Sequence, residues 1–134
     1  MRNLVCLLAF AFILNFSTAL LAEEVLPPGF VALSKIKMSF TDAQKFCEEH
    51  NGRLPLIPGL PSSNVSRLPG GIPIDGFGVS SGPWPEGLPK ELFWTGSEGS
   101  NGPFVIMFFR NGVYAMSSPT EYAERWEDVV CVPK

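Results

Sequence analysis

Hydrophobic residues recur at helical spacing in one stretch of the chain, residues 39–52. The apolar members, Phe40, Ala43 and Cys47, are three and four positions apart, and His50 continues the spacing at the far end. A repeat close to 3.6 residues is typical of an amphipathic helix with one buried face. Ser39 suits the N-cap, and Asn51 followed by Gly52 suits the end of the helix. The pattern therefore predicts a helix with Cys47 on its buried stripe.

Short apolar runs separated by turn residues account for most of the remaining order. The predicted strands are Phe30–Leu33, Phe93–Ser97, Phe104–Phe109, Val113–Met116 and Val129–Val132. Asn111–Gly112 is a strong signal for a tight hairpin turn, and Glu98–Pro103 is predicted to break the chain between two strands. One helix followed by strands joined through hairpins predicts an α+β fold with an antiparallel sheet.

The segment from Pro58 to Pro89 has a different composition, because 14 of its 32 residues are proline or glycine. A free linker is one interpretation. Helix and strand signals lie on both sides, however, so we interpret the segment as one long loop within a single domain. Apolar residues recur along it and are predicted to pack down in part: Ile72, Ile74, Phe77, Val79, Trp84 and Leu88.

Residues 1–22 have the layout of a secretory signal peptide. Arg2 precedes an apolar run from Leu4 to Leu14, and small residues follow, so cleavage is expected after Ala19 or Ala22. An uncleaved membrane anchor is the alternative, but the run of 11 residues is short of the roughly 20 that span a bilayer. The sequence thus predicts export and a mature domain at residues 23–134.

Export changes the interpretation of the cysteines and of the charge. Cys6 lies in the leader, so Cys47 and Cys131 are the two cysteines of the mature chain. In an oxidising compartment a disulfide is their expected state. The net charge of −3 becomes −4 when Arg2 leaves with the leader. An acidic chain with no concentrated basic stretch is a poor partner for nucleic acid.

The order of these motifs resembles bacterial C-type-lectin-like domains of the Lcl and DUF1566 type. The matching residues are Ala43 to Cys47, Arg53-Leu54-Pro55, Trp94-Thr95-Gly96-Ser97 and Cys131-Val132. The resemblance covers about residues 30–133. It implies a C-type-lectin-like fold, with one main N-terminal helix packed on a small antiparallel sheet. It also implies a Cys47–Cys131 bridge and loops that bind carbohydrate or protein ligands, without catalysis.

Two features depart from the family pattern. Val130 stands where a basic residue usually precedes the last cysteine, and the 58–89 segment lacks a second helix. Trp126, Glu127 and Asp128 are similar to the calcium-binding strand of some lectins, but the loop tripeptide that completes such a site is missing. A core tryptophan beside surface acids is the favoured interpretation, and binding is predicted not to need calcium.

Other candidate chemistry is sparse. His50 is the only histidine, which argues against a zinc site of the usual composition. A histidine at the last helical turn more simply complements the helix dipole. Trp84 lies between Pro83 and Pro85, so its backbone is restricted, as suits either a ligand anchor or a plug on the core.

The sequence therefore predicts an exported, non-catalytic module without a cofactor. Its ligand, a carbohydrate or a cell-surface molecule, would bind at the long loop and neighbouring strand ends. The candidate contact residues are Trp84, Glu86, Glu98 and Asn101. The first alternative is a protein–protein interaction domain of the cell envelope, and the second is a small hydrolase.

Overall fold

The computed structural model describes residues 25–60, 67–99, 102–117 and 126–134, and the predicted leader lies outside these ranges. The helix is α1 (Phe40–Glu49). The strands are β1 (Ala32–Leu33), β2 (Gly52–Arg53), β3 (Pro73–Ile74), β4 (Gly78–Val79), β5 (Phe93–Gly99), β6 (Gly102–Phe109), β7 (Gly112–Ser117) and β8 (Val130–Pro133). None of the helices in the described ranges is both long and apolar enough to cross a membrane.

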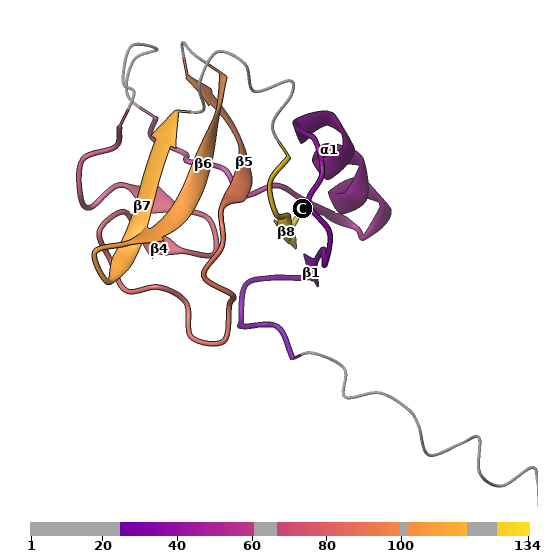
Figure 1. Ribbon diagram of the computed structural model, residues 1–134, viewed down its shortest axis with the longest axis horizontal. Coiled ribbons are helices and arrows are strands. Elements are labelled where there is room, and N and C mark those ends of the chain that lie inside the picture. The colour runs from indigo at the N-terminus through magenta and orange to yellow at the C-terminus, as the bar shows by residue number, and fades with distance from the viewer. Residues whose placement is uncertain (1–24, 61–66, 100–101, 118–125) are drawn as a thin grey trace, which may run out of the picture.

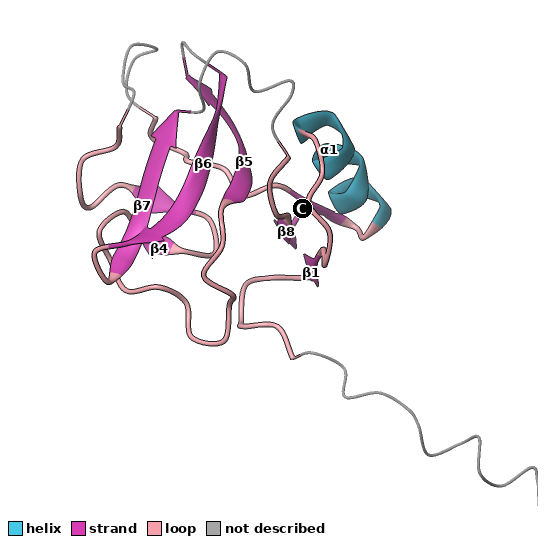
Figure 2. Cartoon of the chain, viewed as in Figure 1, coloured by secondary structure: helices cyan, strands magenta, loops and turns pink. Residues whose placement is uncertain are grey.

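The predicted α+β fold of the C-type-lectin-like kind, a helix packed on a sheet, is wrong. Helix accounts for 11% of the described residues and strand for 39%, so the fold is predominantly β. The described residues form three antiparallel sheets, with the orders β1-β8-β2, β3-β4 and β5-β6-β7. The ten-residue α1 lies at one side of the molecule and the β5-β6-β7 sheet at the other (Figures 1 and 2). The expectation failed because three short strands, β2, β3 and β4, form in segments where no strand was predicted, and they add to the strand content beside a single ten-residue helix.

The helix itself forms as its sequence predicts. The Ser39 hydroxyl accepts a hydrogen bond from the Asp42 amide at 3.2 Å, which caps the first turn. Phe40, Ala43 and Cys47 are buried on one face. Asn51 adopts a left-handed backbone with φ of 56°, which ends the helix. The predicted cap and end of α1 are therefore confirmed, and so is its buried stripe at Phe40, Ala43 and Cys47.

The disulfide joins α1 to the last strand. Cys47 and Cys131 are bonded with an S–S distance of 2.05 Å and are both fully buried. β8 also pairs with β1 on one side and β2 on the other. The beginning and end of the described chain are thus held together at one place.

The long Pro/Gly-rich segment packs on the β5-β6-β7 sheet, which we call the main sheet, as the scattered apolar residues predict. Ile74, Phe77 and Leu88 are buried and form one cluster with residues of β5, β6 and β7. The segment also forms the short β3–β4 hairpin. Val79, by contrast, is 39% exposed. A second cluster joins the buried face of α1 to Trp94 and Val105.

Both outer strands of the main sheet have their edges covered by irregular chain. Four backbone hydrogen bonds do this: Gly96 N to Pro55 O, Leu68 N to Ala115 O, Ser81 N to Val113 O and Val113 N to Gly82 O. The Arg53 guanidinium, 2.6 Å from Asp75, further ties the segment to β2. These contacts occupy strand edges that would otherwise be free to pair with another chain.

The strand boundaries differ from prediction in two places. β5 and β6 stay paired as far as Gly99 and Gly102, so the break predicted over Glu98–Pro103 is too wide. The hairpin turn is also displaced by one residue. Phe109 pairs with Gly112, and the two central residues are Arg110 and Asn111, both with positive φ. That is the pattern of a type I′ turn.

Gly112 is needed for space rather than for the turn. A Cβ atom there would lie 2.8 Å from the carbonyl oxygen of Gly82, which receives the Val113 amide hydrogen bond. We expect Gly112→Ala to lower the free energy of unfolding by about 1–3 kcal/mol, as overpacking does. Chemical denaturation would measure this. Asn111→Gly, which adds no atoms and keeps the left-handed turn, is the control and should change stability by less than about 0.5 kcal/mol. Equal stability of Gly112→Ala and the wild type would contradict the steric argument.

Candidate functional site

Trp84 is held in one orientation by its own segment. Its indole Nε1 donates a hydrogen bond to the Leu88 carbonyl at 2.9 Å. Three aromatic rings surround it, with centroid distances of 5.5 Å to Phe77, 6.2 Å to Phe93 and 5.9 Å to Phe108. The side chain is nevertheless only half-buried. Trp84 therefore packs against the core, which confirms the predicted plug, and its role as a ligand anchor stays a prediction.

A hollow of about 480 Å³ lies beside the exposed part of this ring. We call it the Trp84 hollow, and its lining includes Trp84, Glu86, Leu88, Lys90, Phe108 and Asn111. The Lys90 ammonium lies 4.5 Å from the centre of the Phe108 ring, within the range of a cation–π interaction. The hollow thus places a carboxylate, an ammonium and an amide around aromatic carbon, an arrangement typical of sites that orient a polar ligand.

The structure brings together two of the four predicted contact residues. Trp84 and Glu86 line the same hollow. Glu98 is exposed, but it lies toward the end of β5 away from Phe93, which contacts Trp84. Glu98 lies five positions after Phe93 along the strand, or roughly 16 Å at about 3.3 Å per residue. Asn101 lies outside the described residues.

Sequence reasoning did not select three residues that line the hollow: Lys90, Phe108 and Asn111. Lys90 carried no pattern that would have marked it. Phe108 was predicted to be part of a strand, where alternation from Phe104 and Ile106 indicates which face it occupies. Asn111 was recognised only for its turn preference, although its side chain is available to a ligand as well.

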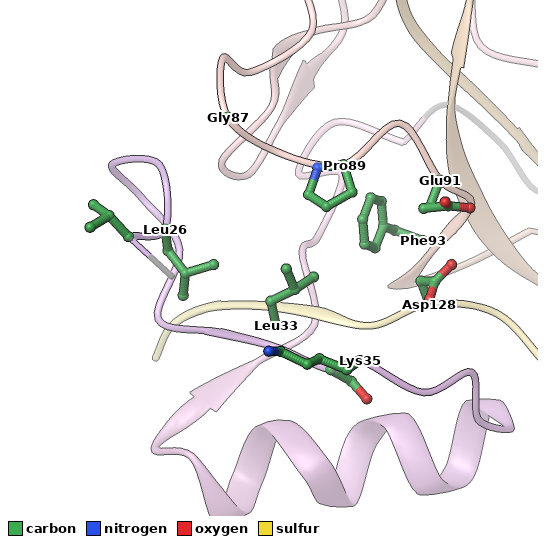
Figure 3. A pocket seen from close by; sticks show the side chains of 10 residues that line it. Leu26, Leu33, Lys35, Gly87, Pro89, Glu91, Phe93 and Asp128 are labelled. Atoms are coloured by element: carbon green, nitrogen blue, oxygen red, sulfur yellow. The ribbon is translucent and has the colours of Figure 1, made fainter. Parts of the chain in front are cut away.

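A second cleft, of about 370 Å³, lies between the N-terminal segment and the chain before β5. Figure 3 shows Leu26 and Leu33 on one side and Glu91 and Asp128 on the other. Phe93 also lines this cleft, but its side chain is 0% exposed. The cleft therefore offers no accessible aromatic ring, and its charges are of both signs.

The calcium candidates do not form a ligand cluster. The Asp128 carboxylate accepts a hydrogen bond from the Lys37 ammonium at 3.0 Å. This hydrogen bond raises the pKa of Lys37, and the negative charges of Asp128, Glu127 and Glu91 act in the same direction against desolvation. Within the described ranges, no three residues among His, Cys, Asp and Glu are grouped as a metal site. Calcium independence stays a prediction.

The favoured interpretation of Trp126 and Glu127 is wrong. Trp126 is 62% exposed, whereas Glu127 is buried. The backbone of Glu127 pairs with Met38, and this pairing turns the glutamate inward and the preceding tryptophan outward. Tertiary pairing at this point overrides the preference of tryptophan for the interior.

His50 does not extend the buried stripe of α1, so that part of the helix prediction is also wrong. The side chain is exposed, with its ring 4.2 Å from that of Phe46. Its Nδ1 lies 2.7 Å from the Phe46 carbonyl oxygen. A carbonyl only accepts, so Nδ1 is the protonated nitrogen. The ring satisfies a carbonyl at the helix end, which agrees with the predicted role at the C-terminal turn.

No protein-family model, curated protein or solved structure matches this chain.

Proposed function

We propose that this protein is an exported, non-catalytic module that binds a saccharide at the Trp84 hollow. The observation that carries the proposal is Trp84 itself. Its ring is fixed by the Leu88 carbonyl and by three aromatic neighbours, yet it remains partly exposed. A side chain that is already ordered loses little entropy when a ligand binds.

The groups around the ring suit hydroxyl-rich ligands. The C–H groups of a pyranose ring carry partial positive charge and pack favourably on the electron-rich face of an aromatic ring. Glu86 accepts hydrogen bonds, Lys90 donates them, and the Asn111 amide does both. Glu86 is the single carboxylate in the described lining of the hollow, whereas hydrolysis of a glycosidic bond normally uses a pair of carboxylates, which supports binding over glycoside hydrolysis.

The Cys47–Cys131 disulfide supports the export part of the proposal. Disulfides persist in oxidising compartments and are rare in the reducing cytosol. The sequence of residues 1–22, with its positive start and apolar run, points the same way.

A glycan array probed with the mature chain would test the proposal, and Glu86→Ala is the sharpest variant. Glu86 is exposed and makes no contact on which the fold depends, so its loss should leave the melting temperature unchanged. Loss of one ligand hydrogen bond should weaken saccharide binding by roughly 2- to 10-fold. Trp84→Ala should weaken it further, although that change also removes core contacts.

Glu98→Ala is the matched control, because it removes the same charge at a distance from the hollow. It should bind like the wild type. Equal loss in the two glutamate variants would place the ligand elsewhere. A different ligand would be indicated if no saccharide bound and the mature chain captured a protein from envelope extract only when Glu86 was intact. The ligand of the Trp84 hollow would then be a protein.

A further inference from the structure

A small basic hollow lies beside the β6–β7 turn, next to the Trp84 hollow. Its volume is about 170 Å³, and its lining includes Arg67, Ser81, Phe109, Arg110 and Tyr114. We call it the arginine pocket. The turn residues line both hollows, since Asn111 borders the Trp84 hollow and the adjacent Arg110 borders the arginine pocket.

The two guanidinium groups flank a pair of aromatic rings. The Arg67 guanidinium carbon lies 6.0 Å from the centre of the Tyr114 ring, and that of Arg110 lies 5.1 Å from the Phe109 ring. The Phe109 and Tyr114 rings are 5.2 Å apart. Arg67 pairs with Met116 toward the far end of β7, and Arg110 lies in the turn before β7, so the two side chains reach the pocket from the two sides of the Phe109–Tyr114 ring pair. The positive charges are thus held by backbone pairing and ring contacts.

No carboxylate of the described residues neutralises these two charges. Aspartate and glutamate are absent from the described lining of the pocket. Among the described residues, the ion pairs join Lys37 to Asp128 and Arg53 to Asp75, and neither Arg67 nor Arg110 takes part in one. The chain as a whole has a net charge of −3, whereas the described lining of this pocket has two guanidinium groups and no carboxylate. The charge of the pocket is therefore opposite in sign to that of the whole chain.

Arg110 is also an unexpected residue for its backbone conformation. Its φ of 50° is left-handed, a region that glycine and asparagine enter at lower cost. The adjacent Asn111 follows that preference, whereas Arg110 does not. The turn therefore does not account for an arginine at this position, and residues held in such conformations often serve a function.

We propose that the arginine pocket binds the oxyanion, carboxylate or sulfate, of an acidic saccharide. The oxyanion part stands on the pocket alone, and the saccharide part rests on the proposed function of the adjoining hollow. Guanidinium groups bind carboxylate and sulfate oxygens through paired hydrogen bonds. At about 170 Å³ the pocket is smaller than the roughly 300 Å³ of sites that enclose larger ligands. It suits one charged group on a sugar unit.

The test is an array that pairs each uronic acid, sialic acid or sulfated saccharide with its uncharged counterpart. The wild type should bind the acidic member roughly 10- to 100-fold more tightly, because hydrogen bonds between charged groups are the stronger kind. Arg110→Asn and Arg67→Gln should each remove most of that preference. Arg110→Asn should also melt no lower than the wild type, since asparagine suits the turn.

Lys45→Gln is the matched control. It removes one positive charge from an exposed position on α1 and should keep the preference. The preference of the wild type should fall with added salt, because the pocket is open to solvent.

Each of the other outcomes would overturn either this inference alone or the proposed function as well. Equal binding of charged and uncharged saccharides, sensitive to Glu86→Ala and insensitive to Arg110→Asn, would overturn this inference and leave the proposed function standing. Absence of all saccharide binding would overturn both. If inorganic sulfate alone bound as tightly as the acidic saccharides, the pocket would be a site for free anions.

Discussion

Replacing Cys47 and Cys131 together by alanine should lower the free energy of unfolding by about 4 kcal/mol, one of the two largest effects expected for this chain. The bridge joins residues separated by 84 positions, and closing so long a loop removes much of the entropy of the unfolded chain. It also holds α1 against β8, the strand that pairs with both β1 and β2. Both sulfurs lie in side chains that are fully buried, so alanine creates no polar contact to compensate.

Urea denaturation of the mature chain, followed by circular dichroism, measures this loss. The wild-type chain kept in reductant through one cycle of unfolding is the control, and it should unfold at the same urea concentration as the double variant. An unchanged midpoint in the double variant would mean that packing around the two positions, and not the covalent link, stabilises the fold.

Trp94→Ala should lower the free energy of unfolding by about 3–5 kcal/mol, as expected for a large buried aromatic side chain. Trp94 is 0% exposed, and its ring centre is 5.7 Å from that of Phe40 on the helix. Its indole Nε1 donates to the Met38 carbonyl at 2.8 Å. Alanine leaves both a cavity between α1 and the main sheet and an unpaired carbonyl.

Trp94→Phe separates these two contributions. It keeps an aromatic ring in the site and removes the indole donor, so the expected loss is smaller, about 1–2 kcal/mol. Urea denaturation of the three proteins is again the measurement. Equal losses for alanine and phenylalanine would show that the hydrogen bond to Met38 dominates and that ring packing contributes little.

Local features of the fold were predictable where the signal involves residues close in sequence. The Ser39 cap, the buried stripe of α1 and the Asn51 end depend on contacts within one helical turn. The hairpin between β6 and β7 also follows from a local signal. Its register does not, because the carbonyl of Gly82, thirty residues earlier, approaches Gly112 and reserves that position for glycine.

In the candidate site, too, some residues could be found from the sequence and others only from the tertiary structure. Trp84 stood out in the sequence because two prolines flank it, and Glu86 lies in the same segment. The distance of Glu98 from Trp84 depends on which end of β5 faces the 83–90 segment. Lys90 and Phe108 meet only because β6 packs beside that segment. The arginine pocket, too, joins residues 43 positions apart that share no sequence pattern.

The sequence by itself determined the helix and the strands β1, β5, β6, β7 and β8 of this protein, the pair of cysteines that can close it, and the tryptophan between two prolines in its long segment. The tertiary structure alone decided the balance of the fold toward β, the inward turn of Glu127 and the outward turn of Trp126, and the grouping of two arginines at one turn. The physical reason is the range of the interactions. Caps, stripes and turns are decided by neighbours a few residues away, whereas packing and charge balance depend on strands that pair across long separations.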